Sequence, residues 1–332
     1  MSTPDSSGRT MQTLRFHSNG PFADVLKLEH APIPVPPAHR IRIKVRACAL
    51  NPADGALCMG LFPGPLPRGV GLDVSGIVDA LGEGVTNVSV GDAVLGSVDY
   101  RKENTAGAAE YAIMDHWHPL PPNLGHIDAA ALTLTLSTET ALRSFELLHM
   151  VSGQTLFVNG AGTTVGYATA QIALLSGLKV IATSGEAYAE KLRGLGVRVT
   201  QYGEGLPERV QQLVGEGDKI DMVLDAAPVS GALPDLIKLV DHTPRKVFTV
   251  SDFAAAKALG ARSSFDEEIV WRYDAVGEYA NLAAEGKYSI PISKSLPLDK
   301  WKDAMELCCS QAARGKVIIL PSSASAEIPS TL

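Results

Sequence analysis

Residues 156–173 read LFVNGAGTTVGYATAQIA, in which an apolar run is followed by three glycines and then by helical spacing. The glycines are Gly160, Gly162 and Gly166. A strand, a tight turn of small residues and a helix N-terminus, in this order, are what the phosphates of a dinucleotide require. The strict spacing G-x-G-x-x-G is not met, because Val165 stands where the third glycine belongs. A glycine-rich turn without a ligand is therefore an alternative at this point.

The segments around this loop alternate between strand and helix patterns. Five apolar runs are typical of strands: QTLFVN (154–159), LKVIATS (178–184), VRVTQY (197–202), DMVLDA (221–226) and RKVFTV (245–250). Helical spacing between them places two apolar sets on one face each: Val165, Ala168, Ile172 and Ala173, then Leu233, Leu236, Ile237 and Val240. Strands this apolar are expected where helices cover both faces of a parallel sheet. The sequence predicts a doubly wound α/β domain over residues 135–275.

The flanking segments have a different residue pattern, in which short β-type runs are separated by glycine and proline. Examples are HRIRIKVRACAL (39–50), DVSGIVDAL (73–81) and DAVLGSV (92–98). After residue 275 the pattern returns to mixed helix and short strand, and it ends in GKVIIL (315–320). We therefore predict one irregular β domain formed by residues 11–134 and 276–332, with the α/β domain inserted between them.

Composition limits the class of protein. The chain has 332 residues, 45% of them hydrophobic and 20% charged, and a net charge of −7. No cluster of lysine and arginine is visible, which argues against nucleic acid as a partner. The four cysteines form no C-x-x-C pair, and no apolar run approaches the roughly 18–20 residues of a membrane span. The first ten residues are polar, without a signal-peptide core, so we expect a disordered tail over 1–10 and a cytoplasmic protein without a membrane partner.

The end of the second strand of the α/β domain bears on the choice of dinucleotide. An acidic residue there selects the free ribose hydroxyl of NAD, and its absence leaves room for the 2′-phosphate of NADP. LKVIATS ends in Thr183 and Ser184, so NADPH is favoured. Glu186 follows two residues later and acts in the opposite direction, because a carboxylate repels a phosphate.

Longer motifs resemble one family. They are ALNPADG (49–55), GLDVSGIVDALGEGV (71–85), VGDAVLG (90–96), GAAEYA (107–112), LAAEGKYSIPI (282–292) and ARGKVIILP (313–321), together with the glycine loop. From residue 11 to 320 the chain resembles the zinc-free quinone oxidoreductase and enoyl reductase branch of the medium-chain dehydrogenase/reductase superfamily. The resemblance implies an α/β protein with a GroES-like β catalytic domain and a Rossmann NADPH-binding domain. It also implies a homodimer, paired edge to edge through RKVFTV and its neighbours.

The resemblance also assigns residues to the cofactor. The family's loop reads Gly-Ala-(Ser or Ala)-Gly-Gly-Val-Gly, and here Thr163 and Thr164 replace the two middle glycines, so that two hydroxyls could donate to the pyrophosphate. Tyr188 aligns with a lysine that binds the 2′-phosphate, which removes one positive partner. The implied cofactor residues are Thr140, Gly160, Ala161, Gly162, Thr163, Thr164, Val165, Gly166, Ser184, Tyr188, Tyr202 and Ser251.

Zinc ligands are not expected. Zinc-dependent relatives have a cysteine and a His-Glu pair where this chain has Asn51 and Leu72-Asp73, and YRKENTAG (100–107) lacks the cysteines of a structural zinc lobe. His116 and His118 lie in DHWHPLPP without a third ligand nearby, so we interpret them as loop residues. Cys308 and Cys309 are adjacent in a helical stretch and are expected in the core.

Without a metal, reduction needs a hydride donor and an acceptor that stabilises its own negative charge, as quinones and α,β-unsaturated carbonyls do. Family position makes Asn51 the candidate catalytic residue, although an asparagine before Pro52 is also a common turn former. No tyrosine or lysine follows it as a proton donor. The candidate substrate pocket consists of Cys58, Leu61, Phe62 and Trp271. The alternative for each of these residues is a position in the hydrophobic core. The expected activity is NADPH-dependent reduction of a quinone or an enoyl substrate; the alternative is an NADPH-binding structural or regulatory protein of the zeta-crystallin type.

Overall fold

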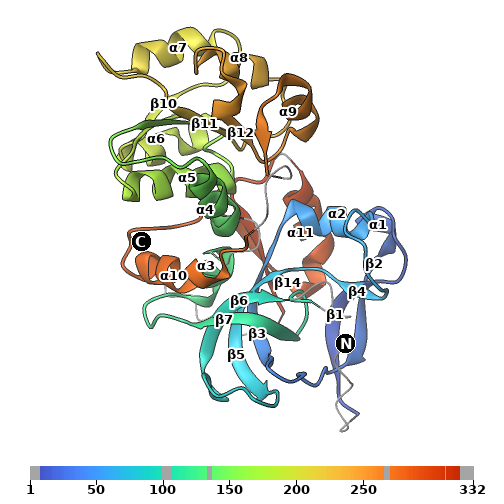
Figure 1. The fold of residues 1–332 in the computed structure, drawn as a ribbon. Helices are drawn as coiled ribbons and strands as arrows, with labels where there is room; N and C mark the ends of the chain where they lie inside the picture. The colour runs from blue at the N-terminus through green and yellow to red at the C-terminus, as the bar shows by residue number, and fades with distance from the viewer. Residues whose placement is uncertain (1–7, 99–105, 133–136, 265–269, 311, 322–332) are drawn as a thin grey trace. The chain divides into compact units, whose positions relative to one another are not determined.

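The computed structural model describes residues 8–98, 106–132, 137–264, 270–310 and 312–321 (Figure 1). It separates into two compact units. Unit 1 consists of Met1–Thr135 and Val276–Leu332, and unit 2 consists of Leu136–Ala275. The domain boundaries predicted from the sequence, after residues 134 and 275, lie at or within one residue of these limits.

Unit 2 contains a six-stranded parallel sheet in the order β10-β9-β8-β11-β12-β13. Its strands are β8 (Thr155–Asn159), β9 (Lys179–Thr183), β10 (Arg198–Thr200), β11 (Met222–Asp225), β12 (Val247–Thr249) and β13 (Arg262–Ser263). The five strands predicted from apolar runs are present. The sixth, β13, has two residues, which is too short to leave a periodic signal.

The extent of β12 corrects one expectation. The run RKVFTV begins with a 3₁₀ turn, Pro244–Lys246, and only Val247–Thr249 forms the strand. β12 pairs with β11 on one side and with β13 on the other. On this side of the sheet the edge strand is β13, a neighbour of the run, and the edge-to-edge pairing of two copies through RKVFTV and its neighbours stays a prediction.

Helices cover both faces of this sheet, as the apolar strands require. They are α4 (Thr138–Leu147), α5 (Thr164–Leu175), α6 (Glu186–Gly194), α7 (Leu206–Leu213), α8 (Leu233–Lys238) and α9 (Phe253–Leu259). Leu156 and Val158 of β8 belong to the core cluster that includes residues of α5 and α6. Phe157, which points to the opposite face, belongs to the cluster that includes residues of α7, α8 and α9.

Unit 1 is built from two sheets, in the orders β2-β1-β4 and β14-β15-β3-β5-β6-β7, with β3 also paired to β7. The first sheet contains β1 (Thr10–Phe16), β2 (Leu26–Pro32) and β4 (Arg68–Gly69). The second contains β3 (Ile41–Leu50), β5 (Asp73–Leu81), β6 (Ala93–Val98), β7 (Tyr111–Pro119), β14 (Ile292–Pro297) and β15 (Lys316–Leu320). Thr10, placed in the tail by sequence, is thus the first residue of a strand. β15 runs antiparallel to β3, with Val317 opposite Leu50, which brings Lys316, the first residue of β15, beside Asn51.

Short helices complete unit 1. They are α1 (Phe22–Val25), α2 (Pro52–Cys58), α3 (His126–Leu132), α10 (Val276–Ala284) and α11 (Trp301–Cys309), and 3₁₀ turns precede the last two at Tyr273–Ala275 and Leu298–Lys300. Cys58 of α2 and Cys308 of α11 lie in one hydrophobic core cluster. Cys309 is exposed, so the expectation of a core position holds for only one of the two adjacent cysteines.

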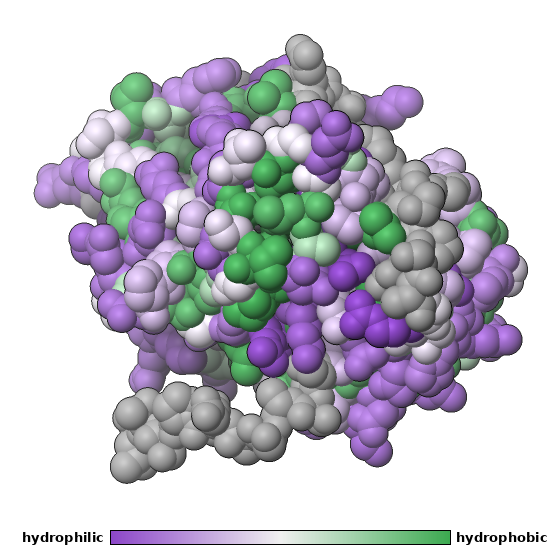
Figure 2. Space-filling view, turned by 90° about the horizontal axis from the view of Figure 1, so that it is seen from below, coloured by the Kyte–Doolittle hydropathy of each residue, from purple (hydrophilic) through white to green (hydrophobic). Residues whose placement is uncertain are grey.

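The surface carries few extended apolar regions on the face shown in Figure 2. Hydrophobic residues gather there in a patch near the centre, with polar residues around it. Among the described residues, no helix has both the length and the hydrophobicity needed to cross a membrane.

Candidate functional site

The glycine loop of unit 2 is shaped by two close backbone approaches. Gly160 ends the turn off β8 with φ +81°, and a Cβ on it would lie 2.6 Å from the Cα atom of Ala227. Gly166 lies in the first turn of α5, where a Cβ would lie 2.3 Å from the carbonyl oxygen of Gly160. Gly166 therefore permits the close packing of helix on strand that the third glycine of the standard spacing provides, one position later.

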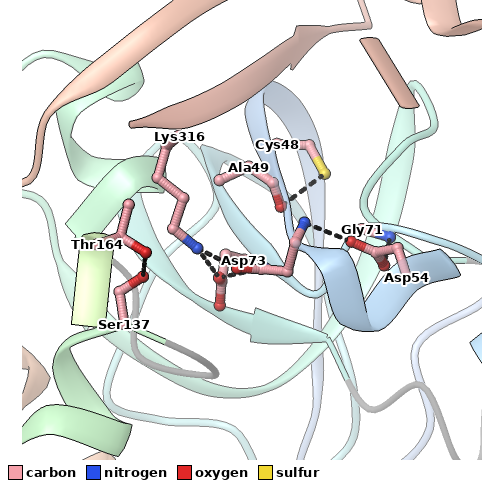
Figure 3. Close-up of polar contacts among 9 residues, drawn as sticks. Cys48, Ala49, Asp54, Gly71, Asp73, Ser137, Thr164 and Lys316 are labelled. Carbon is pink, nitrogen blue, oxygen red and sulfur yellow. Dashed lines mark hydrogen bonds and ion pairs between the residues drawn. The ribbon is translucent and has the colours of Figure 1, made fainter. Parts of the chain in front are cut away.

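The two threonines of the loop have different roles. The Thr163 hydroxyl caps α5: it accepts from the Gly166 N–H at 3.0 Å and donates to the Gly160 carbonyl at 2.9 Å. The Thr164 hydroxyl accepts a hydrogen bond from the Ser137 hydroxyl at 3.1 Å; Figure 3 draws this contact as a dashed line. The idea that both hydroxyls donate to a pyrophosphate thus needs correction, because the proton of Thr163 is used inside the loop and only that of Thr164 remains available.

Four strand ends are tied together beneath the loop. Asn159 donates to Asp225 at 2.9 Å and accepts from Thr183 at 2.7 Å. Thr183 also accepts from the Gly160 N–H at 2.8 Å, and Thr249 donates to Asp225 at 2.9 Å. Burial raises the pKa of Asp225 from its ordinary value, while the bonds from Asn159 and Thr249 oppose the shift.

Sequence reasoning missed this network, although a signal was present. Each member is the last residue of its strand, at the end of β8, β9, β11 or β12. Carboxyl ends of parallel strands meet at one edge of the sheet, where ligands bind in this architecture. A polar residue closing each apolar run was therefore the pattern to look for.

Two of the predicted cofactor residues near β9, Ser184 and Tyr188, lie beside Gly162. A Cβ on Gly162 would lie 3.3 Å from the Ser184 hydroxyl and 3.7 Å from the Tyr188 ring. Ser184 is buried, and Tyr202 is 70% exposed. Tyr188 packs against Tyr167 with ring centroids 5.9 Å apart, and the Lys191 ammonium lies 5.8 Å from the Tyr188 ring centroid. A cation is thus present one helical turn after the position where the family's lysine is missing.

A surface hollow of about 360 Å³ opens beside Ser184. It is lined by Ser184, Glu186, Ala189, Glu190, Arg193, Val199, Thr200 and Gln201. Glu186, which weakens the case for a phosphate here, shares this hollow with Arg193, so that the local charge is not only negative.

The remaining predicted cofactor residues are distributed around the loop. Ala161 is buried and donates its N–H to the Thr183 carbonyl at 2.8 Å. Val165 packs against the core, and Ser251 donates to the Ala227 carbonyl at 2.6 Å. Thr140 lies in the first turn of α4 and is half-buried.

In unit 1, Asn51 lies in a buried polar cluster. Its Nδ2 donates to Asp73 Oδ2 at 2.9 Å, and its Oδ1 accepts from Lys316. Lys316 Nζ also lies 3.3 Å from Asp73 Oδ2. Figure 3 draws the contact between Lys316 and Asp73 as a dashed line. Asn51 and Lys316 are each 3% exposed and Asp73 is fully buried, so water does not screen these interactions.

Asp54 holds the backbone around Asn51. Its two carboxylate oxygens accept from the N–H groups of Asn51 and Gly71, each at 2.7 Å. Burial raises the pKa of Asp54 to about 6, although these two hydrogen bonds oppose the shift. The pKa of Cys48 is raised by burial and by the charges of Asp54 and Asp73, so the thiol beside this cluster stays neutral.

The predicted pocket residues differ in exposure. Cys58 is buried in the core of unit 1, and burial raises the pKa of its thiol to about 12. Leu61 is 71% exposed, and Phe62 is half-buried with its carbonyl accepting from Arg68. Trp271, in unit 2, is 37% exposed, and the guanidinium of Arg143 lies 5.6 Å from its ring centroid. A pocket formed by these four residues stays a prediction.

Zinc does not fit the side chains around Asn51. Tetrahedral zinc takes thiolate, imidazole or carboxylate ligands, whereas here an amide and a carboxylate are both engaged by the Lys316 ammonium. Within the described ranges, no three His, Cys, Asp or Glu side chains converge as a metal site. His116 lies 3.2 Å from Asp115, and a Cβ on Gly277 would lie 2.8 Å from His118, so each histidine has a local neighbour.

Two family models match the chain. The alcohol dehydrogenase GroES-like domain matches residues 37–122, and the zinc-binding dehydrogenase model matches residues 204–319. The first match lies within the irregular β unit, and the second runs from the α/β unit to β15.

Known proteins show the same relationship over the whole chain. The quinone oxidoreductase of Mus musculus is 32% identical over 250 residues, which cover 72% of this chain and 73% of that protein. The chloroplast envelope quinone oxidoreductase homolog of Arabidopsis thaliana is 27% identical and covers 95% of this chain and 100% of its own length. The solved quinone oxidoreductase of Coxiella burnetii shares the fold, with a TM-score of 0.78 and 24% identity over 95% of this chain and 100% of that one. The chain therefore belongs to the oxidoreductases of the medium-chain dehydrogenase/reductase superfamily, in the quinone oxidoreductase branch, with a GroES-like unit and a Rossmann unit.

Proposed function

We propose that this protein is an NADPH-dependent, zinc-independent oxidoreductase that reduces a quinone or an α,β-unsaturated carbonyl compound. One observation carries the proposal: the Lys316 ammonium contacts both Asn51 and Asp73, the side chains that replace zinc ligands of zinc-dependent relatives. A dication cannot share this space with a buried ammonium without strong repulsion. The acceptor must then stabilise its own developing charge, as quinones and enones do.

The residues of unit 2 fit a dinucleotide. Gly160 and Gly166 let the loop pack tightly on the backbone of Ala227 and on the start of α5. In the first turn of α5, Thr163 accepts from the N–H groups of Gly166 and Tyr167, and we propose that those of Thr164 and Val165 donate to a pyrophosphate. Thr164 retains a hydroxyl proton for the same anion. When bound, the reduced nicotinamide supplies the hydride. The choice of NADPH rests on the absence of an acid at Ser184, with Lys191 and Arg193 as nearby cations.

Asn51 is the group we propose to bind the acceptor. A hydrogen bond from its amide to the carbonyl oxygen would strengthen as that oxygen becomes an enolate, which lowers the barrier to reduction. No tyrosine or lysine follows Asn51 in α2, whose residues are Pro52–Cys58, so we propose that water supplies the final proton.

Stopped-flow kinetics tests this function. NADPH bound to the protein is mixed with a panel of 1,4-quinones and enones, and loss of nicotinamide absorbance reports turnover. We expect rapid oxidation by at least one class. Bound NADPH that no member of the panel oxidises would instead favour the alternative, a nucleotide-binding structural or regulatory protein. Absence of nucleotide binding would contradict both.

We also propose a cytoplasmic homodimer. We propose β13 as its contact, because β13, a neighbour of the RKVFTV run, is one of the two edge strands of the unit 2 sheet in the described residues. Light scattering at micromolar concentration should give twice the mass of the 35.0 kDa chain, and a monomer would contradict the assignment. Cell fractionation tests the compartment.

A further inference from the structure

The Asn51 carboxamide is held at both ends by groups of fixed hydrogen-bonding type. An ammonium is only a donor and a carboxylate is only an acceptor. Lys316 must therefore face the amide oxygen, and Asp73 must face the amide nitrogen, as the contacts show. The alternative orientation, with the amide rotated by 180°, would place N–H against N–H and oxygen against oxygen. The direction of the amide is thus set by chemistry.

This arrangement leaves donor capacity unused. The amide nitrogen carries two N–H bonds and gives one to Asp73, and the ammonium carries three and gives one each to Asn51 and Asp73. Within the described part of the chain, the second amide N–H and the third ammonium N–H have no hydrogen-bond partner. The donors that remain suit an oxygen that gains negative charge.

The charges of the cluster also favour a donor role for Asn51. Lys316 polarises the amide by binding its oxygen, which makes the remaining N–H a stronger donor. Asp73 balances the ammonium, so the pair is neutral as a whole although both members are buried. Neither charged residue needs to touch the acceptor for this to operate.

We infer that Lys316 and Asp73 are positioning residues that lock the Asn51 carboxamide with one N–H directed to the carbonyl oxygen of the acceptor. The inference rests on the proposed function for the identity of that oxygen. It assigns a role to Lys316, which family position did not single out, and to Asp73, which family position marked only as standing where a zinc ligand is missing. Asn51, the N-cap residue of α2, is thus oriented by a lysine of β15 that lies 265 residues later in the chain.

Combined substitution is the first test. Asn51→Ala should lower kcat for a 1,4-quinone about 100-fold, as loss of one oxyanion donor does. Lys316→Met with Asp73→Asn, which leaves neither charge buried alone, should lower kcat about 10- to 100-fold while the NADPH dissociation constant stays within about twofold. Adding both changes to Asn51→Ala should cost little more, because they act through the missing amide. Lys316→Arg, which keeps a cation beside Asn51, should retain more activity than the Lys316→Met, Asp73→Asn double variant.

A matched control separates positioning from general destabilisation. Arg42 and Asp79 form another ion pair across β3 and β5 of unit 1, with Nε to Oδ1 and Nη2 to Oδ2 both at 2.9 Å. Arg42→Met with Asp79→Asn should lower thermal stability but leave kcat within about twofold. Unchanged kcat in the Lys316/Asp73 double variant, or equal losses with and without Asn51, would overturn the inference.

A second measurement does not depend on turnover. In protein labelled with ¹⁵N at asparagine, the Asn51 side-chain amide signals are identified by their loss in Asn51→Ala. A locked amide should give two well-separated proton signals with slow solvent exchange, and the Lys316/Asp73 double variant should bring these signals together and speed exchange. Equal exchange in the two proteins would overturn the inference even if the enzyme reduced no quinone, whereas slow exchange without turnover would sink only the proposed function.

Discussion

The glycine loop of unit 2 and the Asn51 cluster of unit 1 both depart from the patterns of their relatives, and they accommodate the departure differently. In the loop, residues 160–166 carry no charge, and two threonines are absorbed by capping α5 and by a contact with Ser137. Around Asn51, three buried side chains contact one another through an ammonium, an amide and a carboxylate. Steric space therefore decides which side chains the loop tolerates, whereas charge compensation decides which side chains the Asn51 cluster tolerates. The predictions below challenge this distinction.

Volume added at Gly166 should have the largest effect. In Gly166→Ala the new methyl group would meet the Gly160 carbonyl oxygen at 2.3 Å, and its nearest neighbours, from Gly160 and Ala161, are all backbone atoms that cannot rotate away. We expect the free energy of unfolding to fall by about 3 kcal/mol and nucleotide affinity to fall at least tenfold, measured by urea denaturation and fluorescence titration. Gly194→Ala, also in a helix but with nothing within 4 Å of the new methyl group, is the control and should be neutral or stabilising. Equal effects of the two changes would refute the spatial limit.

Acid should change stability through the Asn51 cluster. Because the folded-state pKa of Asp54 is raised from 3.8 to about 6, the folded protein binds a proton more readily than the unfolded chain between these values. The contribution of Asp54 to unfolding free energy therefore decreases as pH rises from about 4 to about 6, by about 3 kcal/mol at most.

Urea unfolding of wild type and Asp54→Asn from pH 4 to 8 measures this term. The Asp54→Asn variant lacks one of the two acceptors that serve the N–H groups of Asn51 and Gly71. This loss lowers the unfolding free energy of the variant by the same amount at every pH, so it does not change the shape of the difference curve. The stability of wild type relative to the variant should fall as pH rises through this range and stay level above it. Parallel curves would show that the cluster is not limited by charge.

Cofactor preference should respond to one charge at the end of β9. Ser184→Asp places a carboxylate beside Gly162, where we propose the 2′-phosphate to bind, and should shift the NADPH-to-NADH ratio of kcat/KM toward NADH by about tenfold or more. Ser184→Asn has nearly the same size without the charge and should keep most of the wild-type ratio. If the two variants behave alike, size rather than charge sets the preference at this position.

Much of this architecture follows from local pattern. The five apolar runs of unit 2 became parallel strands, and four of them, β8, β9, β11 and β12, are buried on both faces, whereas β10 is half-buried. DVSGIVDAL (73–81) coincides with β5. The strand β13 could not be predicted, because two residues contain no period. The predicted strand RKVFTV (245–250) likewise included Arg245 and Lys246, which belong to the 3₁₀ turn Pro244–Lys246.

The Asn51 cluster shows what local pattern cannot supply. Asn51 was singled out by its motif, but its partner Lys316 is 265 residues away and lies in a run that by itself reads only as a short strand. The antiparallel pairing of β15 with β3, with Val317 opposite Leu50, creates the contact. Long-range strand pairing depends on the whole unit, so the lysine's role was not visible from its neighbours in sequence.

The smallest expected effects separate the two threonines of the loop. Thr163→Val removes the cap of α5 and should lower the free energy of unfolding by about 1 kcal/mol. Because the loop is then less rigid, the free energy of nucleotide binding should weaken by a similar amount. Thr164→Val keeps the cap and should leave stability nearly unchanged, but it removes the one hydroxyl proton that remains available to a pyrophosphate. Its nucleotide affinity should therefore fall about 3- to 10-fold. Ser137→Ala, which deletes the partner of Thr164 without touching the loop, should give a smaller loss of affinity in the same direction. If Thr164→Val lowered stability as much as Thr163→Val and left affinity unchanged, both threonines would be structural, and the loop would bind phosphate through its backbone alone.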